Sequence, residues 1–317
     1  MTSPLGHLEK LYGATSMSCG RQGSDSNPFV SVIVPVYNDP LRLETCLRAL
    51  EEQTYPRDSY EVIVVDNGSD ESIEHVVAGF SQAMASYESR PGSYAARNRG
   101  LSLSVGEILA FTDSDCIPAP DWIKKGVEIL SKHPNHKVVG GRVEFLFEAP
   151  DLPTATELYD SMIHLDTKRY IEQEGFTATA NLFTYRSIFD HIGYFDADLR
   201  SSGDREWGQR ATSLGFRPIY ADDVLVAHPA RYSFAQLREK TVRLVLGYKG
   251  MKKKRCSTGK KLNIASLRSL LPPLITLTRL GLSRKVPAID HIKILLFCLA
   301  LHSVKMRELF RIRLLGY

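Results

Sequence analysis

The sequence predicts an α/β protein with a doubly wound, mostly parallel sheet flanked by helices and a basic helical extension at its C-terminal end. Two observations predict this class. The mostly apolar runs "VSVIVPV", "EVIVV" and "EILAF" at 30–36, 61–65 and 107–111 are each followed by a stretch with helical spacing. Strands that are apolar throughout are typical of a parallel sheet covered on both faces. A length of 317 residues, 43% of them hydrophobic, allows one large domain or two smaller ones.

The first half of the chain repeats a unit of strand, loop and helix. The strand at 29–37 ends at Asn38-Asp39-Pro40, where a helical pattern begins. The later units are a strand at 61–65 with a helix through 73–77, the segment 85–93 with a helix at 93–104, and a strand at 107–111 with a helix at 120–131. Three such repeats after the first strand predict successive parallel crossovers.

The second half departs from this repeat. Its predicted elements are a strand at 137–147, helical residues at 154–173, a short strand and a helix start within 176–189, a helix at 204–214 closed by Gly215, and two short strands around Asp222-Asp223. We therefore divide the chain into a flexible leader at 1–27, an α/β domain at 28–232 with halves at 28–136 and 137–232, and a basic helical region at 233–317.

Charge is distributed unevenly along the chain. Residues 233–317 hold 19 Lys and Arg against three acidic residues, so this region carries +16, and the total of +4 leaves −12 on the first 232 residues. A basic extension predicts an anionic partner, either a lipid surface or nucleic acid. Nucleic acid is disfavoured because the extension has few aromatic residues and no recognisable binding module.

The apolar stretches of the extension are short. The longest uninterrupted run is the eight residues 294–301, whereas a membrane-spanning helix needs about 20. Short apolar stretches flanked by Arg and Lys fit helices that lie in the interface of an anionic membrane, so we expect peripheral contact through 249–317. The alternative is that these helices pack on the rest of the chain or on a second subunit.

The cysteines and the N-terminus bear on localisation. Five cysteines are scattered without a CxxC pair, and the first residues do not combine a basic start with an apolar core of signal length. We expect free thiols and a cytoplasmic protein that is at most peripheral on the inner face of the cell membrane.

Polar side chains follow the predicted strands at their carboxyl ends, where ligands bind in such sheets. They are Asn38-Asp39, Asp66-Asn67-Gly68 and, within "FTDSDCIPAPDW", Asp113 and Asp115. Two carboxylates spaced i, i+2 in a loop reach one divalent cation, and oxygen ligands suit magnesium or manganese. The alternative is a capped turn before a helix, which is how we interpret Asp121. The sequence has neither GxxxxGK[ST] nor GxGxxG after the first strand, which disfavours kinase and dinucleotide-binding functions.

Five ordered segments, "VSVIVPVYN", "VIVVDNGSD", "PGSYAARNRG", "AFTDSDC" and "SGDREWGQRA", resemble the family 2 glycosyltransferases with the GT-A fold. The resemblance covers about 29–232. It implies that 28–136 is a nucleotide-binding half and 137–232 an acceptor-binding half.

The resemblance also implies which residues contact the nucleotide. The first loop wraps the base, the second offers a carboxylate to the base edge, the helix at 93–104 meets the nucleotide or its phosphates, and the first acid of the pair touches the ribose. These residues are Pro35, Val36, Tyr37, Asn38 and Asp39, then Asp66 and Asn67, then Arg97 and Asn98, then Asp113 and Ser114. The alternatives are a turn at 66–68 and an ordinary exposed helix cation at Arg97.

The same resemblance implies a metal site. Asp113 and Asp115 are the expected ligands of Mn²⁺ or Mg²⁺, and His228 follows a strand at a place where family members supply a third ligand. The metal neutralises charge that develops on the leaving diphosphate. The alternative for His228 is a structural role, as for most isolated histidines.

A general base is implied within "SGDREWGQRA". Asp204 keeps the aspartate of the family motif and is the expected base, Glu206 is the second candidate, and Gly203 stands where the family commonly has an acid. Alternatively, Asp204 caps the following helix. Trp207 either stacks on a sugar or packs in the core.

The resemblance therefore implies a metal-dependent transfer of a sugar, with inversion, from a nucleoside-diphosphate sugar that is expected to be UDP-linked. The expected acceptor is a hydroxyl group of a saccharide or lipid-linked molecule, in cell-surface polysaccharide or glycolipid assembly. Two alternatives stay open. One is a sugar-nucleotide-binding scaffold without turnover, which the missing acid at Gly203 would permit. The other is a nucleotidyltransferase, disfavoured because a glycine-rich first loop is missing after residue 37.

Overall fold

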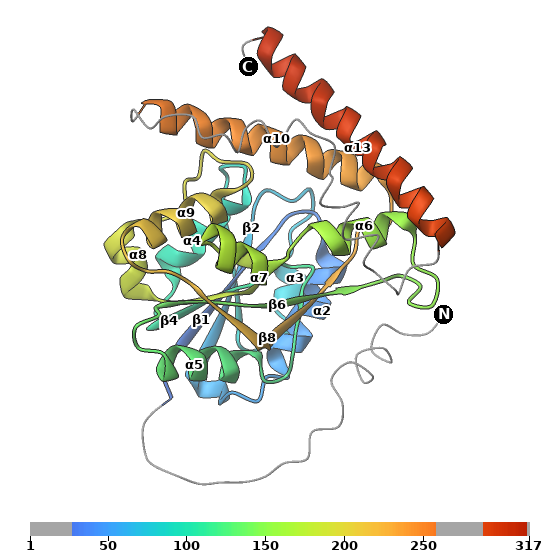
Figure 1. Ribbon diagram of the computed structural model, residues 1–317. Coiled ribbons are helices and arrows are strands. Elements are labelled where there is room, and N and C mark those ends of the chain that lie inside the picture. The colour runs from blue at the N-terminus through green and yellow to red at the C-terminus, as the bar shows by residue number, and fades with distance from the viewer. Residues whose placement is uncertain (1–26, 258–287, 316–317) are drawn as a thin grey trace.

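The computed structural model describes residues 27–257 and 288–315, and this part of the chain contains an eight-stranded sheet (Figure 1). The strand order is β3-β2-β1-β4-β7-β6-β8-β5. The strands are β1 (Val30–Val36), β2 (Tyr60–Asp66), β3 (Ala83–Tyr87), β4 (Ile108–Phe111), β5 (Ile117–Pro118), β6 (Val138–Leu146), β7 (Leu182–Tyr185) and β8 (Ile219–Pro229).

The sheet is mostly parallel, as the sequence predicts. β1 runs parallel to β2 and β4, β2 to β3, and β6 to β8, whereas β7 is antiparallel to both of its neighbours and β5 is antiparallel to β8. Val36 lies opposite Asp66, so β1 and β2 end at the same level. Because β1, β2 and β4 point the same way, the loops that leave them gather at one edge of the sheet.

Helices cover both faces of the sheet, which confirms the doubly wound prediction (Figure 1). The buried side chains of α2, α3 and α5 pack on one face, and those of α4, α8 and α9 pack on the other. The helices are α2 (Pro40–Glu51), α3 (Glu74–Val77), α4 (Ser93–Leu103), α5 (Trp122–Lys132), α6 (Ala155–Ile163), α7 (Thr167–Arg169), α8 (Arg186–Ile192), α9 (Gly203–Ser213), α10 (Phe234–Ser257) and α13 (Ala288–Leu315), with 3-10 turns at Arg57–Ser59 and Thr179–Asn181 and a π-helical turn at Tyr170–Glu174.

One tryptophan lies in each layer. Trp207 is completely buried, stacks on Phe189 with ring centroids 4.6 Å apart, and donates from Nε1 to the Gly193 carbonyl (3.1 Å). Trp207 therefore packs in the core, which settles the alternative that the sequence left open. Trp122 lies in the other layer and donates from Nε1 to Asn181 Oδ1 (2.9 Å).

Segment 217–230 differs from the prediction of two short strands. It contains the single strand β8, whose register with β6 shifts so that Gly141 lies opposite Ala221 but Arg142 lies opposite Leu225. The intervening residues 222–224 form a bulge, which turns Asp222 and Asp223 outward and lets the strand continue. A Cβ at Gly141 would overlap the Val224 carbonyl, so this close approach requires glycine.

Two local predictions were right in outline but wrong in detail. The helical stretch predicted at 154–173 breaks after α6, because Leu165 adopts a left-handed conformation (φ 52°) before the chain resumes in α7. Asp121 occupies the N-cap position of α5, but its side chain makes no capping bond and instead pairs with Lys125 at 2.8 Å.

The C-terminal helices pack on the domain through α6. Ile294 and Cys298 of α13 are buried against α6 side chains, including Leu158 and Met162, and α10 also contacts both helices (Figure 1). Among the described residues, no helix has the length and apolar character to span a bilayer. Much of the basic run 249–261 and the apolar stretch 270–282 lie outside the described residues, so membrane contact through 249–317 stays a prediction.

A buried carboxylate joins α10 to the domain. Asp160 of α6 is completely buried, and its oxygens pair with Arg231 Nη1 and Lys240 Nζ, each at 3.2 Å, and lie 2.7 Å from His164 Nδ1. Burial alone would raise the pKa of Asp160, but His164, Lys240 and Arg231 together hold it well below its ordinary value. Asp160 therefore stays ionised and fixes the start of α10.

We expect Asn181→Ala to lower the free energy of unfolding by about 3 kcal/mol, because three buried polar groups lose their partner. Besides accepting from Trp122, Asn181 donates from Nδ2 to the carbonyls of Arg142 and Val224, both at 2.9 Å. Urea denaturation measures the change. Ser131→Ala, on the same helix as Trp122, is the control and should cost less than about 0.5 kcal/mol. Equal losses for the two variants would contradict the role of Asn181.

Candidate functional site

A cavity of about 890 Å³ lies where the loops after β1, β2 and β4 gather. Parallel strands direct these loops to one place, so the location follows from the topology. The predicted site residues that line it are Pro35, Val36, Tyr37, Asp39, Asn67, Arg97, Asp113, Ser114, Asp115, Asp204 and His228. The fold thus brings the segments expected to act together into one cavity.

Three predicted nucleotide-binding residues lie outside the cavity lining. Asn38, at φ 51°, bonds through its amide to Asp70 and thereby ties the first loop to the second. Asp66 is buried and accepts from the Ser69 amide (2.9 Å), as in a turn. Asn98 exchanges two hydrogen bonds with the backbone of Phe195 (2.8 and 3.1 Å). Their contacts shape the loops around the cavity, and direct contact of these three side chains with a nucleotide stays a prediction.

Asn67 lines the cavity and also holds its wall. Its Nδ2 donates to the carbonyls of Glu88 and Arg90 (3.0 and 2.8 Å), and its Oδ1 accepts from the Gly92 amide (2.6 Å). Gly92 adopts φ 129°, a conformation that favours glycine, directly before α4. The second loop therefore positions the start of the helix that carries Arg97.

Arg97 is buried in the lining of the cavity and is not the exposed helix cation that the sequence allowed. Its side chain is 4% exposed, its Nη2 pairs with Asp113 Oδ1, and its guanidinium lies over the Tyr94 ring, 5.5 Å from the centroid. The Asp113 side chain remains 32% exposed, so part of it faces the cavity. A buried charge-assisted pair of this kind fixes the orientation of the Asp113 carboxylate.

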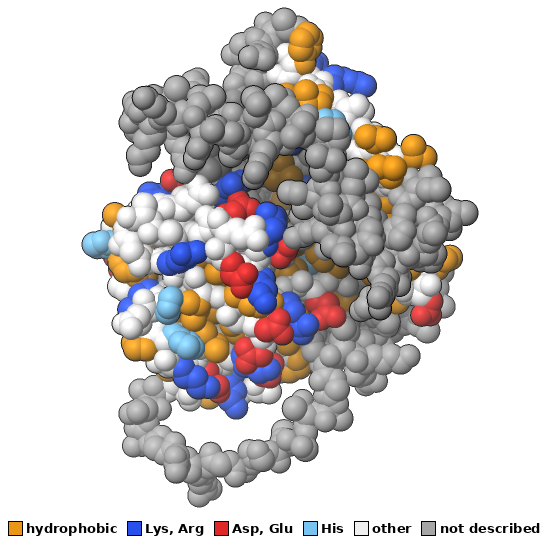
Figure 2. Space-filling model, in the orientation of Figure 1, with side chains coloured by type: hydrophobic (Ala, Val, Ile, Leu, Met, Phe, Trp, Pro, Cys, Tyr) orange, Lys and Arg blue, Asp and Glu red, His pale blue; other side chains and the backbone are white. Residues whose placement is uncertain are grey.

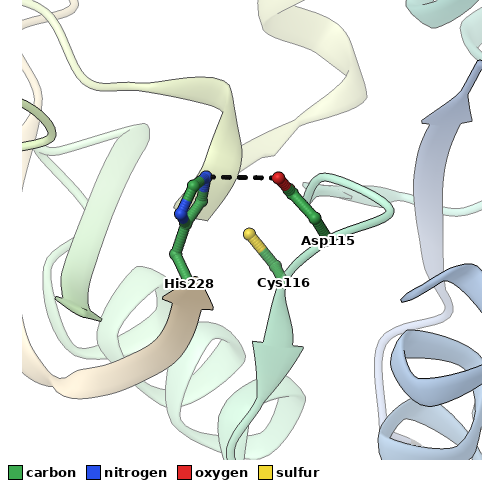
Figure 3. Close-up of side chains that lie close together, drawn as sticks. All are labelled: Asp115, Cys116 and His228. Carbon is green, nitrogen blue, oxygen red and sulfur yellow. Dashed lines mark ion pairs between the residues drawn. The ribbon is translucent and has the colours of Figure 1, made fainter. Parts of the chain in front are cut away.

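Asp115 and His228 face each other across the cavity (Figure 3). His228 Nδ1 lies 2.8 Å from the Pro229 carbonyl, which can only accept, so Nδ1 donates, and in the neutral form of the ring Nε2 is the nitrogen that carries the lone pair. Nε2 lies 3.6 Å from Asp115 Oδ2. Two acceptors that point at one position suit a cation between them, and the backbone bond at Nδ1 is the support usual for a metal-binding histidine.

Cys116 also lies within this cluster, although the sequence analysis did not place it there. One ligand atom from each of Asp115, Cys116 and His228 lies within 4.8 Å of the others (Figure 3). Burial, followed by the carboxylate of Asp115, raises the pKa of the Cys116 thiol well above its ordinary value. Carboxylate oxygens and imidazole suit Mn²⁺, and oxygens suit Mg²⁺, whereas thiolate sulfur suits softer metals, so Asp115 and His228 define the site for Mn²⁺ or Mg²⁺. Asp113, the other predicted ligand, is not part of this cluster.

Asp204 lies at the start of α9 and lines the cavity. Its Oδ1 accepts from the Tyr94 hydroxyl (3.1 Å) and from the Arg205 amide (2.8 Å). Ser202 holds the N-cap position, so Asp204 is not the cap residue. Burial raises the pKa of Asp204, with Arg97 and Tyr94 opposing it. A carboxylate with a raised pKa beside a cavity is suited to accept a proton.

Gly203 is explained by Tyr94. A Cβ at Gly203 would lie 2.7 Å from the Tyr94 ring, so the acid that the family commonly carries there does not fit without moving this ring. Tyr94 in turn bonds to Asp204. Glu206 lies outside the lining, because both of its oxygens pair with Arg210 at 3.0 Å. The contacts therefore favour Asp204 over Glu206 as the base.

Several lining residues were not anticipated from the sequence. Tyr87 is the last residue of the edge strand β3, and Tyr94 lies in the first turn of α4. Arg200, Arg231 and Arg243 approach from the loop before α9, from the end of β8 and from α10. The positive charge of the extension indicated that Arg243 could meet an anionic partner, but no local pattern indicated that Arg243 faces the cavity.

The fold and this site define a glycosyltransferase. Residues 31–202 match the profile of Glycosyl transferase family 2. "Glycosyltransferase AglE" from Haloferax volcanii is 42% identical over 225 residues, which cover 69% of this chain and 73% of the relative. The chain therefore belongs to glycosyl transferase family 2, as its motifs predict.

Other relatives carry more specific names. A Methanococcus voltae protein, "Dolichyl N-acetyl-alpha-D-glucosaminyl phosphate 3-beta-D-2,3-diacetamido-2,3-dideoxy-beta-D-glucuronosyltransferase", is 22% identical over 228 residues, 68% of this chain and 71% of that protein. The mannosyltransferase PcManGT from Pyrobaculum calidifontis, solved with GDP-Man and Mn²⁺, superposes with a TM-score of 0.60 at 20% identity, covering 96% of this chain and 94% of that one. S. aureus TarS 1-349 with UDP-GlcNAc gives 0.52 at 19%, covering 84% and 78%. These likenesses confirm the GT-A fold.

We expect Asp115→Ala and His228→Ala each to weaken Mn²⁺ binding at least tenfold, because each removes one of two protein ligands (about 1.4 kcal/mol per factor of ten). Electron paramagnetic resonance of free Mn²⁺, with UDP or GDP present, measures the affinity without turnover. Asp223→Ala removes an exposed acid from the strand that carries His228 and should leave binding unchanged. Unaltered affinity in both site variants would exclude this pair as the metal site.

Proposed function

We propose that this chain is a metal-dependent glycosyltransferase that moves a sugar from a nucleoside-diphosphate sugar to a hydroxyl group of a saccharide or lipid-linked acceptor, with inversion, in cell-surface polysaccharide or glycolipid assembly. One observation carries the proposal. Asp115 and His228 present two lone pairs to one position in a cavity that also contains the base candidate Asp204. The Mn²⁺ and sugar nucleotide named for PcManGT support it.

The nucleotide lies against the loops that follow β1 and β2. Tyr37 and Tyr87 both line the cavity and are 62% and 60% exposed, so they offer aromatic surface to a base. Asp113, held by Arg97, presents its exposed part to the ribose. A metal held by Asp115 and His228 neutralises charge on the departing diphosphate.

The acceptor side is served by Asp204. Its carboxylate removes the proton from the acceptor hydroxyl as the oxygen bonds to the anomeric carbon, while the bond from that carbon to the diphosphate oxygen breaks. Tyr94 and the Arg205 amide fix the orientation of Asp204. A single displacement of this kind inverts the anomeric carbon and needs no second nucleophilic carboxylate, and the family resemblance is what supports inversion. The scaffold alternative loses its main support, since Tyr94 accounts for Gly203.

We expect the chain to release nucleoside diphosphate from one member of a panel of UDP-, GDP- and dTDP-sugars when Mn²⁺ and a mixture of saccharide and lipid-linked acceptors are supplied. EDTA and Asp115→Ala should abolish release, because the leaving diphosphate is then not neutralised. A coupled assay for the released diphosphate reads out turnover. Binding of a sugar nucleotide without turnover would favour the scaffold, and unchanged turnover in EDTA would contradict metal dependence.

We expect Asp204→Asn to lower kcat by about 10²–10⁴-fold, the usual contribution of a general base. Because burial raises the pKa of Asp204, the wild-type rate should fall as pH drops through a value above that of an ordinary carboxyl group, about 3.9. The base is active when ionised, so the loss lies on the acid side. In the pH profile of kcat/KM, this limb should persist in Glu206→Gln. Its loss in Glu206→Gln with retention in Asp204→Asn would reverse the assignment.

A further inference from the structure

A second hollow of about 180 Å³ adjoins the main cavity. The two share Asp115, His228, Arg231 and Arg243, but no residue of the loops after β1, β2 or β3 lines the smaller one. Arg42 of the first turn of α2, which pairs with Asp39 at 3.1 Å, lines its other wall. A group bound in the smaller hollow would therefore lie beside the Asp115–His228 pair without occupying the loops that follow β1, β2 and β3.

The wall formed by α10 and the end of β8 carries more positive than negative charge. Arg231 and Lys240 share the single carboxylate of Asp160, each at 3.2 Å. Arg243 also lines the hollow and makes no ion pair within the described part of the chain. Glu239 is the one acid that α10 adds to the lining, and it is exposed at the rim.

The pKa of Lys240 is consistent with unbalanced charge at this place. Burial, together with Arg231 and Arg243, lowers the pKa of Lys240 to about 7 against the opposing effect of Asp160. A bound anion would relieve the repulsion among these three cations. Arginine also matches the oxygens of a phosphate group with two parallel donors.

We propose that Arg231, Lys240 and Arg243 form an anion subsite that holds a phosphate group of the acceptor beside the Asp115–His228 pair. The inference rests on the proposed function and names its acceptor class as phosphate-linked. The phosphate stays intact during transfer, because the reacting hydroxyl belongs to another part of the acceptor and loses its proton to Asp204. Leu244 and Leu246 of α10 are exposed near Arg243, so a lipid-linked phosphate and a soluble sugar phosphate both present the required chemistry.

The test measures binding by isothermal titration calorimetry with the full chain and Mn²⁺, both without nucleotide and with saturating UDP or GDP. The probes are farnesyl phosphate, glucose 1-phosphate, inorganic phosphate and farnesol. We expect at least one phosphate-bearing probe to bind in the presence of nucleotide and farnesol not to bind. Tighter binding of farnesyl phosphate identifies a lipid source, and tighter binding of glucose 1-phosphate identifies a soluble one.

Arg243→Gln should weaken binding of the phosphate probes at least tenfold while leaving nucleotide affinity and the thermal midpoint unchanged. Arg238→Gln is the matched control, because Arg238 is exposed on the same helix but lines neither hollow. Lys240→Met, the second variant, should also weaken binding of the phosphate probes.

The proposal is overturned if no phosphate probe binds in the presence of nucleotide and Arg243→Gln weakens nucleotide binding. Arg243 would then contact the sugar-nucleotide donor. Equal losses in Arg238→Gln and Arg243→Gln would also overturn it. Binding is measured without turnover, so a chain that binds these probes but releases no nucleoside diphosphate would contradict the proposed function and leave the subsite standing.

Discussion

The antiparallel pairing of β5 with β8 determines where the chemistry of the site lies. Ile117 lies opposite Ala227, so the residues directly before β5 meet the end of β8, and Asp115 faces His228. β8 is held on its other side by β6, which pairs with β7 and through it with β4. A slip of one residue in β8 would turn His228 to the opposite face. The Asp115–His228 pair therefore depends on the register of the whole second half of the sheet.

A second constraint is the close approach of α9 to α4. The Tyr94 ring occupies the space that a side chain at residue 203 would need, and the Tyr94 hydroxyl bonds to Asp204. Arg97 lies over the same ring and pairs with Asp113. One aromatic side chain thus connects Asp113, the acid proposed to face the ribose, with Asp204, the proposed base. This packing requires glycine at residue 203, and the Asp204 carboxylate still faces the cavity.

The sequence predicted those parts of the fold and site that have a local pattern. Buried parallel strands are apolar along their length, so β1, β2 and β4 and the acids after them could be located. The proposed role of His228 came only from the family resemblance, because β5 has two residues and gives no periodic signal. Cys116, Tyr94 and Arg243 reach the site through packing between distant segments, which no local pattern encodes. The sequence did not separate two roles for Asp66, because an aspartate is expected both in a turn and at a ligand contact. In the structure Asp66 accepts a turn hydrogen bond from the Ser69 amide.

The uneven distribution of charge along the chain serves contacts within the molecule in addition to the predicted anionic partner. The sequence pairs an acidic domain with a basic extension, and in the structure the two meet at Asp160, where Arg231 and Lys240 are held. One carboxylate does not balance two cations, so positive charge remains at the junction. Arg231 and Lys240 also line the smaller hollow beside the cavity. Figure 2 shows basic and acidic side chains intermingled on the visible face of the molecule. Attachment of α10 and recognition of an anion there draw on the same charges, so ligand binding and docking of the extension should strengthen each other.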